Sequence, residues 1–176
     1  MRRLWFALAL GLAPLAASCG YAPTGAAQQT TTAIKAPFAL TGRVVDNAGL
    51  LLADDRQTLV QRLEALQRTT GPQLVVVTVP ELKDMTIEQL GLALGNGWGI
   101  GDSRRNDGVL MIVAPKEHQT RIEVGKGLEA TLTNALCAEI IEHDMIPQFR
   151  EGHFKAGIDA GVDRLIAALS TRPART

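Results

Sequence analysis

The chain of 176 residues is poor in cysteine, histidine and aromatic side chains, and each shortage narrows its chemistry. It has two cysteines, Cys19 and Cys137, three histidines and 4% aromatic residues. Two cysteines exclude a disulfide framework, and the histidines lack the spacing of zinc ligands. Cys137 lies in an apolar helical pattern, where a lone cysteine usually packs as a small hydrophobic residue. A disulfide between the two cysteines is the alternative.

The chain also lacks an excess of charge and a long hydrophobic run. It contains 18 basic and 18 acidic residues. A nucleic-acid-binding protein needs a basic face, so we expect no nucleic acid partner. No apolar stretch reaches the roughly 20 residues that a membrane-spanning helix requires.

The amino terminus has the features of an export signal. Met1-Arg2-Arg3 is basic, Leu4–Leu15 is almost wholly apolar, and Ala16-Ala17-Ser18-Cys19 follows. This pattern predicts a signal peptide over residues 1–18. The last segment resembles a lipobox, so we expect lipidation of Cys19, with cleavage by ordinary signal peptidase as the alternative. Gly20 does not resemble the Asp that retains lipoproteins in the inner membrane, which favours the periplasmic side of an outer membrane.

Composition divides the rest of the chain into a tether, one domain and a short tail. Residues 19–37 are small and polar, which predicts a flexible tether. Residues 38–170 are rich in Leu, Val, Ile and Ala and suffice for one core, and residues 171–176 form a tail. Loss of residues 1–18 removes two Arg and leaves a net charge near −2.

Hydrophobic periodicity predicts an α/β domain. Leu59, Leu63 and Leu66 mark a helix, and Thr86 begins a second helix with a capping box. The remaining predicted elements are strands over 73–79, 108–114 and 120–124, a helix that Pro147 stops, and a final helix from Gly152. Strands 73–79 and 108–114 flank a helical crossover and should be parallel, and the short turn after Ala114 predicts an antiparallel hairpin. The order predicts an α/β/α sandwich with a small mixed sheet between helical layers.

The hairpin brings several polar loop residues to one end of the sheet. Asn106 and Asp107 precede one strand, while Gly125, Gly127 and Glu129 follow its partner. Oxygen ligands of this kind suit a hard cation such as Ca²⁺. The alternatives are that the glycines and Asn106 form ordinary turns, that Asp107 caps backbone donors, and that Glu129 pairs with a basic neighbour.

Trp98 stands among glycines that carry no side chain to pack. Gly97, Gly99 and Gly101 surround it, so its ring either anchors this loop to the core or forms an exposed binding patch. Ser103 has no nucleophile-elbow pattern around it, and no residue pair suggests a nucleophile with its base.

Five motifs in order resemble the TPM domain, named after a thylakoid lumen protein, a photosystem II-associated protein and a modulator of levamisole receptors. They begin at Gly42, Trp98, Asn106, Val124 and Ile146 and cover about residues 40–168. The resemblance implies an α/β/α sandwich on the outer or lumenal side of a membrane, often tethered there. Some members bind Ca²⁺, and plant members are described as acid phosphatases.

The resemblance also implies a set of site residues. Those that match the family's motifs are Asp46, Trp98, Gly99, Gly101, Asp107, Gly108, Gly125, Gly127 and Glu129. The chain departs from the pattern in three places: Asn106-Asp107 replaces the usual Asp-Asn, Asn134 stands where Asp is common, and His153 stands where Asp or Asn is common.

Two functions follow as expectations. The first is a membrane-tethered accessory protein of an envelope complex that binds a divalent cation through Asp46, Asn106, Asp107 and Glu129. The second is a metal-assisted acid phosphatase, in which Lys126 or Arg104 would stabilise developing charge.

Overall fold

The computed structural model describes residues 36–171. The predicted signal peptide, Cys19, nearly all of the tether and residues 172–176 lie outside this range, so the expectations about them stay predictions. Within the described range, no helix is long and apolar enough to span a bilayer. Cys137 is a free, buried thiol, and burial raises its pKa.

The sheet has four strands in the order β1-β2-β3-β4. Their bounds are Val44–Asp46 for β1, Gln73–Thr78 for β2, Gly108–Ala114 for β3 and Gln119–Val124 for β4. The first two pairs are parallel and β3 pairs antiparallel with β4, which confirms the crossover and the hairpin. Strand β1 was not predicted, because three residues are too few to show a periodic pattern.

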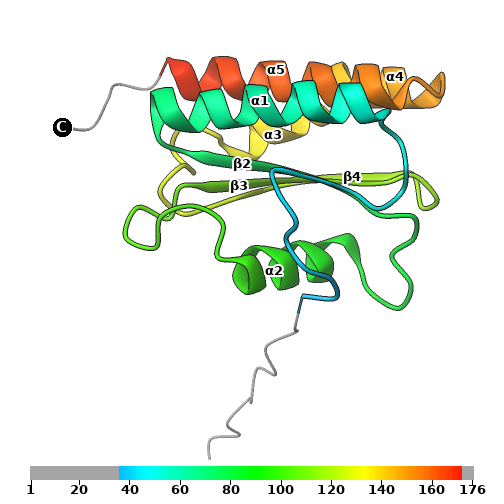
Figure 1. Cartoon of the computed structure of the whole chain (residues 1–176), viewed down its shortest axis with the longest axis horizontal. Coiled ribbons are helices and arrows are strands. Elements are labelled where there is room, and N and C mark those ends of the chain that lie inside the picture. Colours follow the sequence, from blue (N-terminus) through cyan, green and yellow to red (C-terminus); the bar gives the residue numbers. More distant parts are fainter. Residues whose placement is uncertain (1–35, 172–176) are drawn as a thin grey trace, which may run out of the picture. The chain divides into compact units, whose positions relative to one another are not determined.

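The helices form a layer on each face of the sheet (Figure 1). Their bounds are Ala53–Thr70 for α1, Ile87–Trp98 for α2, Asn134–Glu139 for α3, Ile140–Met145 for the π-helix η1, Ile146–Arg150 for α4 and Phe154–Ser170 for α5. Helices α1, α3, α4 and α5 lie on one face and α2 on the other. This arrangement confirms the predicted α/β/α sandwich with a mixed sheet.

Two cores hold these layers together because β2 and β3 are covered on both faces. All of β3 is buried, and its side chains alternate between the cores. Val109 and Met111 join α1, η1 and α5 in the first core, whereas Leu110 and Ile112 join α2 in the second. An apolar run without polar alternation therefore produced the strand at the centre of the sandwich.

The prediction that Pro147 stops a helix is wrong. The helix that begins at Asn134 continues through η1 into α4, and Pro147 lies in the first turn of α4. A proline is tolerated there, since its missing N–H would have no required partner at a helix start. The turn of the π-helix η1 is wider than that of an α-helix, so α4 can begin anew after it although the helical path is continuous.

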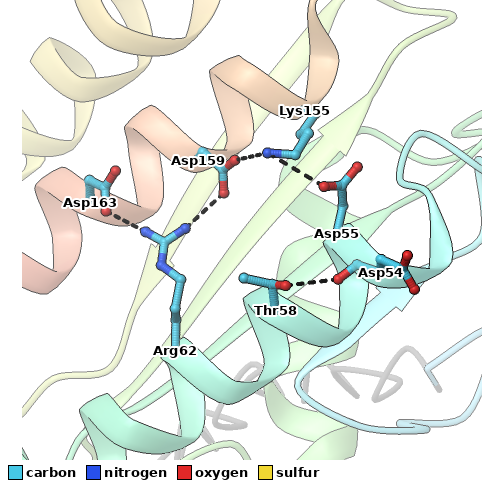
Figure 2. Close-up of polar contacts among 7 residues, drawn as sticks. All are labelled: Asp54, Asp55, Thr58, Arg62, Lys155, Asp159 and Asp163. Carbon is cyan, nitrogen blue, oxygen red and sulfur yellow. Dashed lines mark hydrogen bonds and ion pairs between the residues drawn. The ribbon is translucent and has the colours of Figure 1, made fainter.

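Ion pairs join α1 to α5 across the outer helical layer. Figure 2 shows Arg62 of α1 between Asp159 and Asp163 of α5, with its Nη1 2.8 Å from Asp159 Oδ1. Lys155 lies 2.7 Å from Asp159 Oδ2 and 3.6 Å from Asp55 Oδ1. The contact with Asp159 raises the pKa of Lys155. These partly exposed pairs align two helices whose apolar faces supply most of the packing.

Candidate functional site at the start of strand β3

Three loops meet where β3 begins, and backbone hydrogen bonds join them. The Gln73 N–H donates to the Asp107 carbonyl at 3.1 Å, and the Gly125 N–H donates to the Gly108 carbonyl at 2.8 Å. The Gly127 N–H donates to the carbonyl of Asn106 at 3.0 Å. The hairpin therefore brings the loop before β3 against the turn after β4, as the sequence predicted.

These loops approach so closely that side chains are excluded at several positions. A Cβ on Gly127 would lie 1.8 Å from the Arg105 carbonyl oxygen, and one on Gly125 would lie 2.2 Å from the Asn106 carbonyl oxygen. Gly101 combines a φ of 89° with a similar approach to the backbone of Gly108. Backbone must pass over backbone here, and glycine alone permits that contact.

Asp107 is the buried centre of this arrangement. The residue is 1% exposed, and both of its carboxylate oxygens accept hydrogen bonds. Oδ1 accepts the Asp102 N–H at 2.8 Å, and Oδ2 accepts from Nε of Arg105 at 2.6 Å. Among the alternatives left open by the sequence, the structure shows Asp107 capping a backbone donor. The contact with Asp107 raises the pKa of Arg105.

Asp102 and Asn106 shape the loop around that carboxylate. Asp102 Oδ1 accepts the backbone N–H groups of Arg105 and Arg104, each at 3.0 Å, and these bonds lower the pKa of Asp102. The Asn106 N–H donates to the Asp102 carbonyl at 2.7 Å, while Asn106 itself has a φ of 48°. Asparagine is among the few residues that tolerate this left-handed conformation, which suits the order Asn106-Asp107.

A hollow of about 550 Å³ opens beside these loops, between α2 and the end of β4. We call it the loop hollow, and its polar side chains are Asn96, Asn106, Glu123, Lys126 and Glu129. Asn106 and Glu129 thus share one cavity, as predicted. Asp107 is buried and is not among its lining residues.

The predicted fourth metal ligand lies elsewhere. Asp46 ends β1 and pairs in register with Thr78, at the end of the sheet opposite the start of β3. Its carboxylate accepts the N–H groups of Leu50 and Leu51, both at 3.0 Å, and a hydrogen bond from the Thr78 hydroxyl. Strand β2 spans the sheet from the start of β3 to the end that holds Asp46, and its length of about 16 Å separates these two ends. The structure therefore does not bring Asp46 to Asp107, Asn106 and Glu129.

Without Asp46, the predicted ligands that remain at this end of the sheet are Asn106, Asp107 and Glu129. Within residues 36–171, no three side chains of the His, Cys, Asp and Glu types are placed to hold a metal ion together. Glu129, the amide of Asn106 and backbone carbonyls offer oxygen ligands of the type that Ca²⁺ accepts. Asp107 can contribute only after its contact with Arg105 opens.

The family model of the TPM domain matches residues 44–168, which cover the whole sheet and both helical layers. The chain belongs to the TPM domain family. No curated protein matches it in sequence.

Solved structures give the same result for the fold. The TPM domain is similar to an NMR structure of the N-terminal domain of a protein from P. gingivalis, with 34% identity and a TM-score of 0.69, over 74% of this chain and 83% of that one. The BA42 protein of Bizionia argentinensis is 18% identical, with a TM-score of 0.61 over 72% of this chain and 86% of its own. The N-terminal domain of the cg2496 protein from Corynebacterium glutamicum is 14% identical, with a TM-score of 0.59 over 80% of this chain and 88% of that one. The last two show the shared fold.

Trp98 of this TPM domain is partly buried at the end of α2. Its ring packs on the second core and meets Phe38 edge-on, with 5.6 Å between ring centroids. Its Nε1–H donates to the Phe38 carbonyl at 2.9 Å. Gly99, in the left-handed conformation, then ends the helix. The indole therefore anchors the segment around Phe38, which leads into the domain. The loop that precedes β3 follows shortly after Trp98.

Sequence reasoning assigned no hydrogen bond or ion pair to Arg105, Asp102 or Gln73. Gln73 Oε1 accepts the Gly101 N–H at 3.0 Å, which ties the loop to the neighbouring strand. Asp102 carried a usable signal, since an Asp followed by polar residues often caps the backbone two or three positions later. Nothing in the spacing of Arg105 and Asp107 distinguished an ion pair from two solvated charges.

Proposed function

We propose that this TPM domain is an exported, membrane-tethered accessory protein of an envelope complex, and that it binds a divalent cation at the loop hollow. Ca²⁺ is the ion that its oxygen ligands suit. The observation that supports the proposal most is the buried Asp107 carboxylate, which faces the exposed side chain of Arg105. The side chain of Arg105 is 54% exposed and that of Asp107 is 2% exposed.

Because the Arg105 guanidinium contacts the Asp107 carboxylate, it would compete with a cation for that carboxylate. A buried carboxylate needs a positive partner, because an unpaired buried charge is strongly unfavourable. The guanidinium supplies the charge from solvent, where a flexible side chain can leave at little cost. A divalent ion held by Asn106 and Glu129 at the edge of the loop hollow would replace it once the Asp107 side chain turned toward the ion. Competition with a tethered Arg keeps the expected affinity low.

Titration calorimetry with Ca²⁺ tests this replacement. Arg105→Gln should bind Ca²⁺ more tightly than the unaltered protein, because the competing charge is gone, and Glu129→Gln should bind it more weakly. Arg104→Gln is the matched control: it removes the same charge from the neighbouring exposed position, which forms no ion pair in the described structure. Equal affinities in the two Arg variants would contradict the competition.

The tether and the partner rest on the sequence outside the described residues. The basic, apolar and small-residue segments ending at Cys19 support export and lipidation on the periplasmic side of an outer membrane. Mass spectrometry of the mature amino terminus tests this directly. An acylated Cys19 is expected, and an unmodified amino terminus would contradict the lipid anchor. Cross-linking in intact membranes, followed by purification, would identify the partner complex.

A metal-assisted acid phosphatase is the second candidate, and Lys126 favours it. Its side chain lines the loop hollow beside Asn106 and Glu129, where a cation and an ammonium group could together hold a phosphoryl oxygen. Turnover of a phosphomonoester by highly purified protein, lost in both Lys126→Ala and Asp107→Ala, would support this function. Turnover that survives both substitutions would exclude the loop hollow as its site.

A further inference from the structure

Strand β4 forms one edge of the sheet, and a row of its backbone groups has no backbone partner among residues 36–171. The Gly125 N–H donates to the Gly108 carbonyl, and this bond fixes which residues of β4 turn toward β3. By the alternation of antiparallel ladders, Thr120, Ile122 and Val124 direct their N–H and C=O groups away from β3. Within residues 36–171, no other backbone segment hydrogen-bonds to these three residues.

The other side of β3 agrees with this alternation. The carbonyl of Val113 accepts the Val79 N–H at 3.0 Å, so the odd-numbered residues of β3 turn toward β2. Val113 pairs with Thr120 in the hairpin, which places the backbone groups of Thr120 on the open side of β4. The opposite edge of the sheet, β1, is only three residues long. Strand β4 therefore offers the longer template for another strand.

We propose that a second copy of this chain pairs with β4, antiparallel about a twofold axis at Ile122. In this register Ile122 lies opposite its own copy, and Thr120 lies opposite Val124 of the second copy. All three outward-facing residues then hydrogen-bond across the axis. The two sheets become one continuous sheet, as a closed twofold interface allows.

Charge selects this register over its neighbours. Arg121 of one copy lies opposite Glu123 of the other, and the reciprocal pair forms on the far side of the axis. A register centred on Arg121 would place two arginines opposite each other, and one centred on Glu123 would place two glutamates together. Both alternatives are disfavoured because like charges directly opposite destabilise a strand pair.

Helix α2 is positioned to join the interface. It packs beneath both β3 and β4, with Gly91 against Glu123 and Glu88 3.3 Å from Arg121. Neighbouring strands are about 4.8 Å apart, and packed helices are about 8–10 Å apart. Because α2 lies under both β3 and β4, pairing of the two β4 strands would bring the two copies of α2 to about the distance of packed helices. Leu92 of α2 is 58% exposed, and the second copy would cover it.

Sedimentation equilibrium of the mature protein, in density-matched detergent, tests the pairing. The unaltered protein should show a concentration-dependent monomer–dimer equilibrium. Arg121→Glu and Glu123→Arg should each weaken dimerisation by roughly tenfold or more, because each places like charges opposite each other. Arg68→Glu, the same charge change on the exposed side of α1, should leave dimerisation unchanged.

Mixing the two edge variants gives the decisive comparison. The Arg121→Glu variant carries two acidic side chains on this edge and the Glu123→Arg variant carries two basic ones. Their mixture should therefore dimerise where each variant alone does not. The double variant Arg121→Glu with Glu123→Arg should also dimerise by itself. Circular dichroism establishes that every variant is folded. A monomeric unaltered protein, or folded variants whose mixture stays monomeric, would overturn the proposal.

Discussion

The Nε atom of Arg105 lies 2.6 Å from Oδ2 of Asp107, so an exposed side chain supplies the positive charge for a buried carboxylate two residues away. The other carboxylate oxygen accepts the Asp102 N–H. Asp107 thus organises the loop without an ion, and a cation that binds there must compete with a group on the same loop. Substitutions can separate these two roles of Asp107.

Replacement of Asp107 should destabilise the domain. Asp107→Ala removes the acceptor of the Asp102 N–H and the partner of Arg105, at a cost of about 1–3 kcal/mol in the free energy of unfolding. Asp107→Asn keeps an acceptor for Asp102 and should cost less. Urea denaturation measures both, with the exposed Asp84→Ala as control. If Asp107→Ala were as stable as the control, Asp107 would not organise the loop.

The loop should lose order in acid through Asp102. Backbone donors from Arg105 and Arg104 lower the pKa of Asp102 below its ordinary value of 3.8. A carboxylate whose folded pKa is depressed stabilises the fold above the unfolded pKa, and this contribution disappears as pH falls through the folded pKa. The amide signals of Arg104 and Arg105 should therefore titrate with a midpoint below 3.8.

The Asp102→Asn variant is the control for this titration, since it retains the acceptor oxygen and removes the ionisation. Its two amide signals should be flat over the same pH range. A midpoint at or above 3.8 in the unaltered protein would show that the backbone bonds do not favour the ionised form.

Two glycine substitutions should have opposite effects. Gly127→Ala would place a Cβ 1.8 Å from the Arg105 carbonyl oxygen, so the loops must separate, at a cost of at least about 2 kcal/mol. Gly95→Ala lies within α2 and meets nothing within 4 Å, so it should stabilise the protein by roughly 0.5–1 kcal/mol through helix propensity. Thermal melts compare the pair, and equal melting temperatures would refute the close backbone approach.

Loss of the Trp98 ring should free the segment that enters the domain. Because the ring is partly buried, Trp98→Ala should cost about 2–3 kcal/mol, less than the roughly 3–5 kcal/mol of a fully buried ring. Trp98→Phe keeps much of the packing but loses the hydrogen bond to Phe38, at about 1 kcal/mol. Hydrogen exchange of residues 38–40 should rise in both variants. Unchanged exchange would mean that the indole does not anchor this segment.

The layers of the fold were predictable because their signals are local. Unbroken apolar runs marked β2 and β3, and the short turn after Ala114 fixed the hairpin. From that hairpin alone, Asn106 and Glu129 could be placed at one end of the sheet. The capping box at Thr86, confirmed by its reciprocal hydrogen bonds with Gln89, likewise depends on residues three positions apart.

What the sequence could not show depends on contacts between distant elements. Strand β1 exists because Val44 and Val45 pair with β2, and that pairing places Asp46 at the opposite end of the sheet from Asp107. The continuation past Pro147 depends on the wide turn of η1, which packs under α5. The direction of the Asp107 side chain could not be predicted either, because it depends on the loop that brings the Asp102 N–H and the Arg105 guanidinium to its carboxylate.

The proposed function depends above all on one exchange, in which a divalent cation at the start of β3 replaces the Arg105 guanidinium. The most direct measurement is an amide-resolved NMR titration of the unaltered protein with Ca²⁺ in the millimolar range. We expect shifts confined to residues 98–108 and 124–130, a change in the Arg105 Nε–H signal as it leaves Asp107, and a rise in melting temperature through binding to the folded state. If these signals and the melting curve are unchanged in millimolar Ca²⁺, the loop hollow is not a cation site.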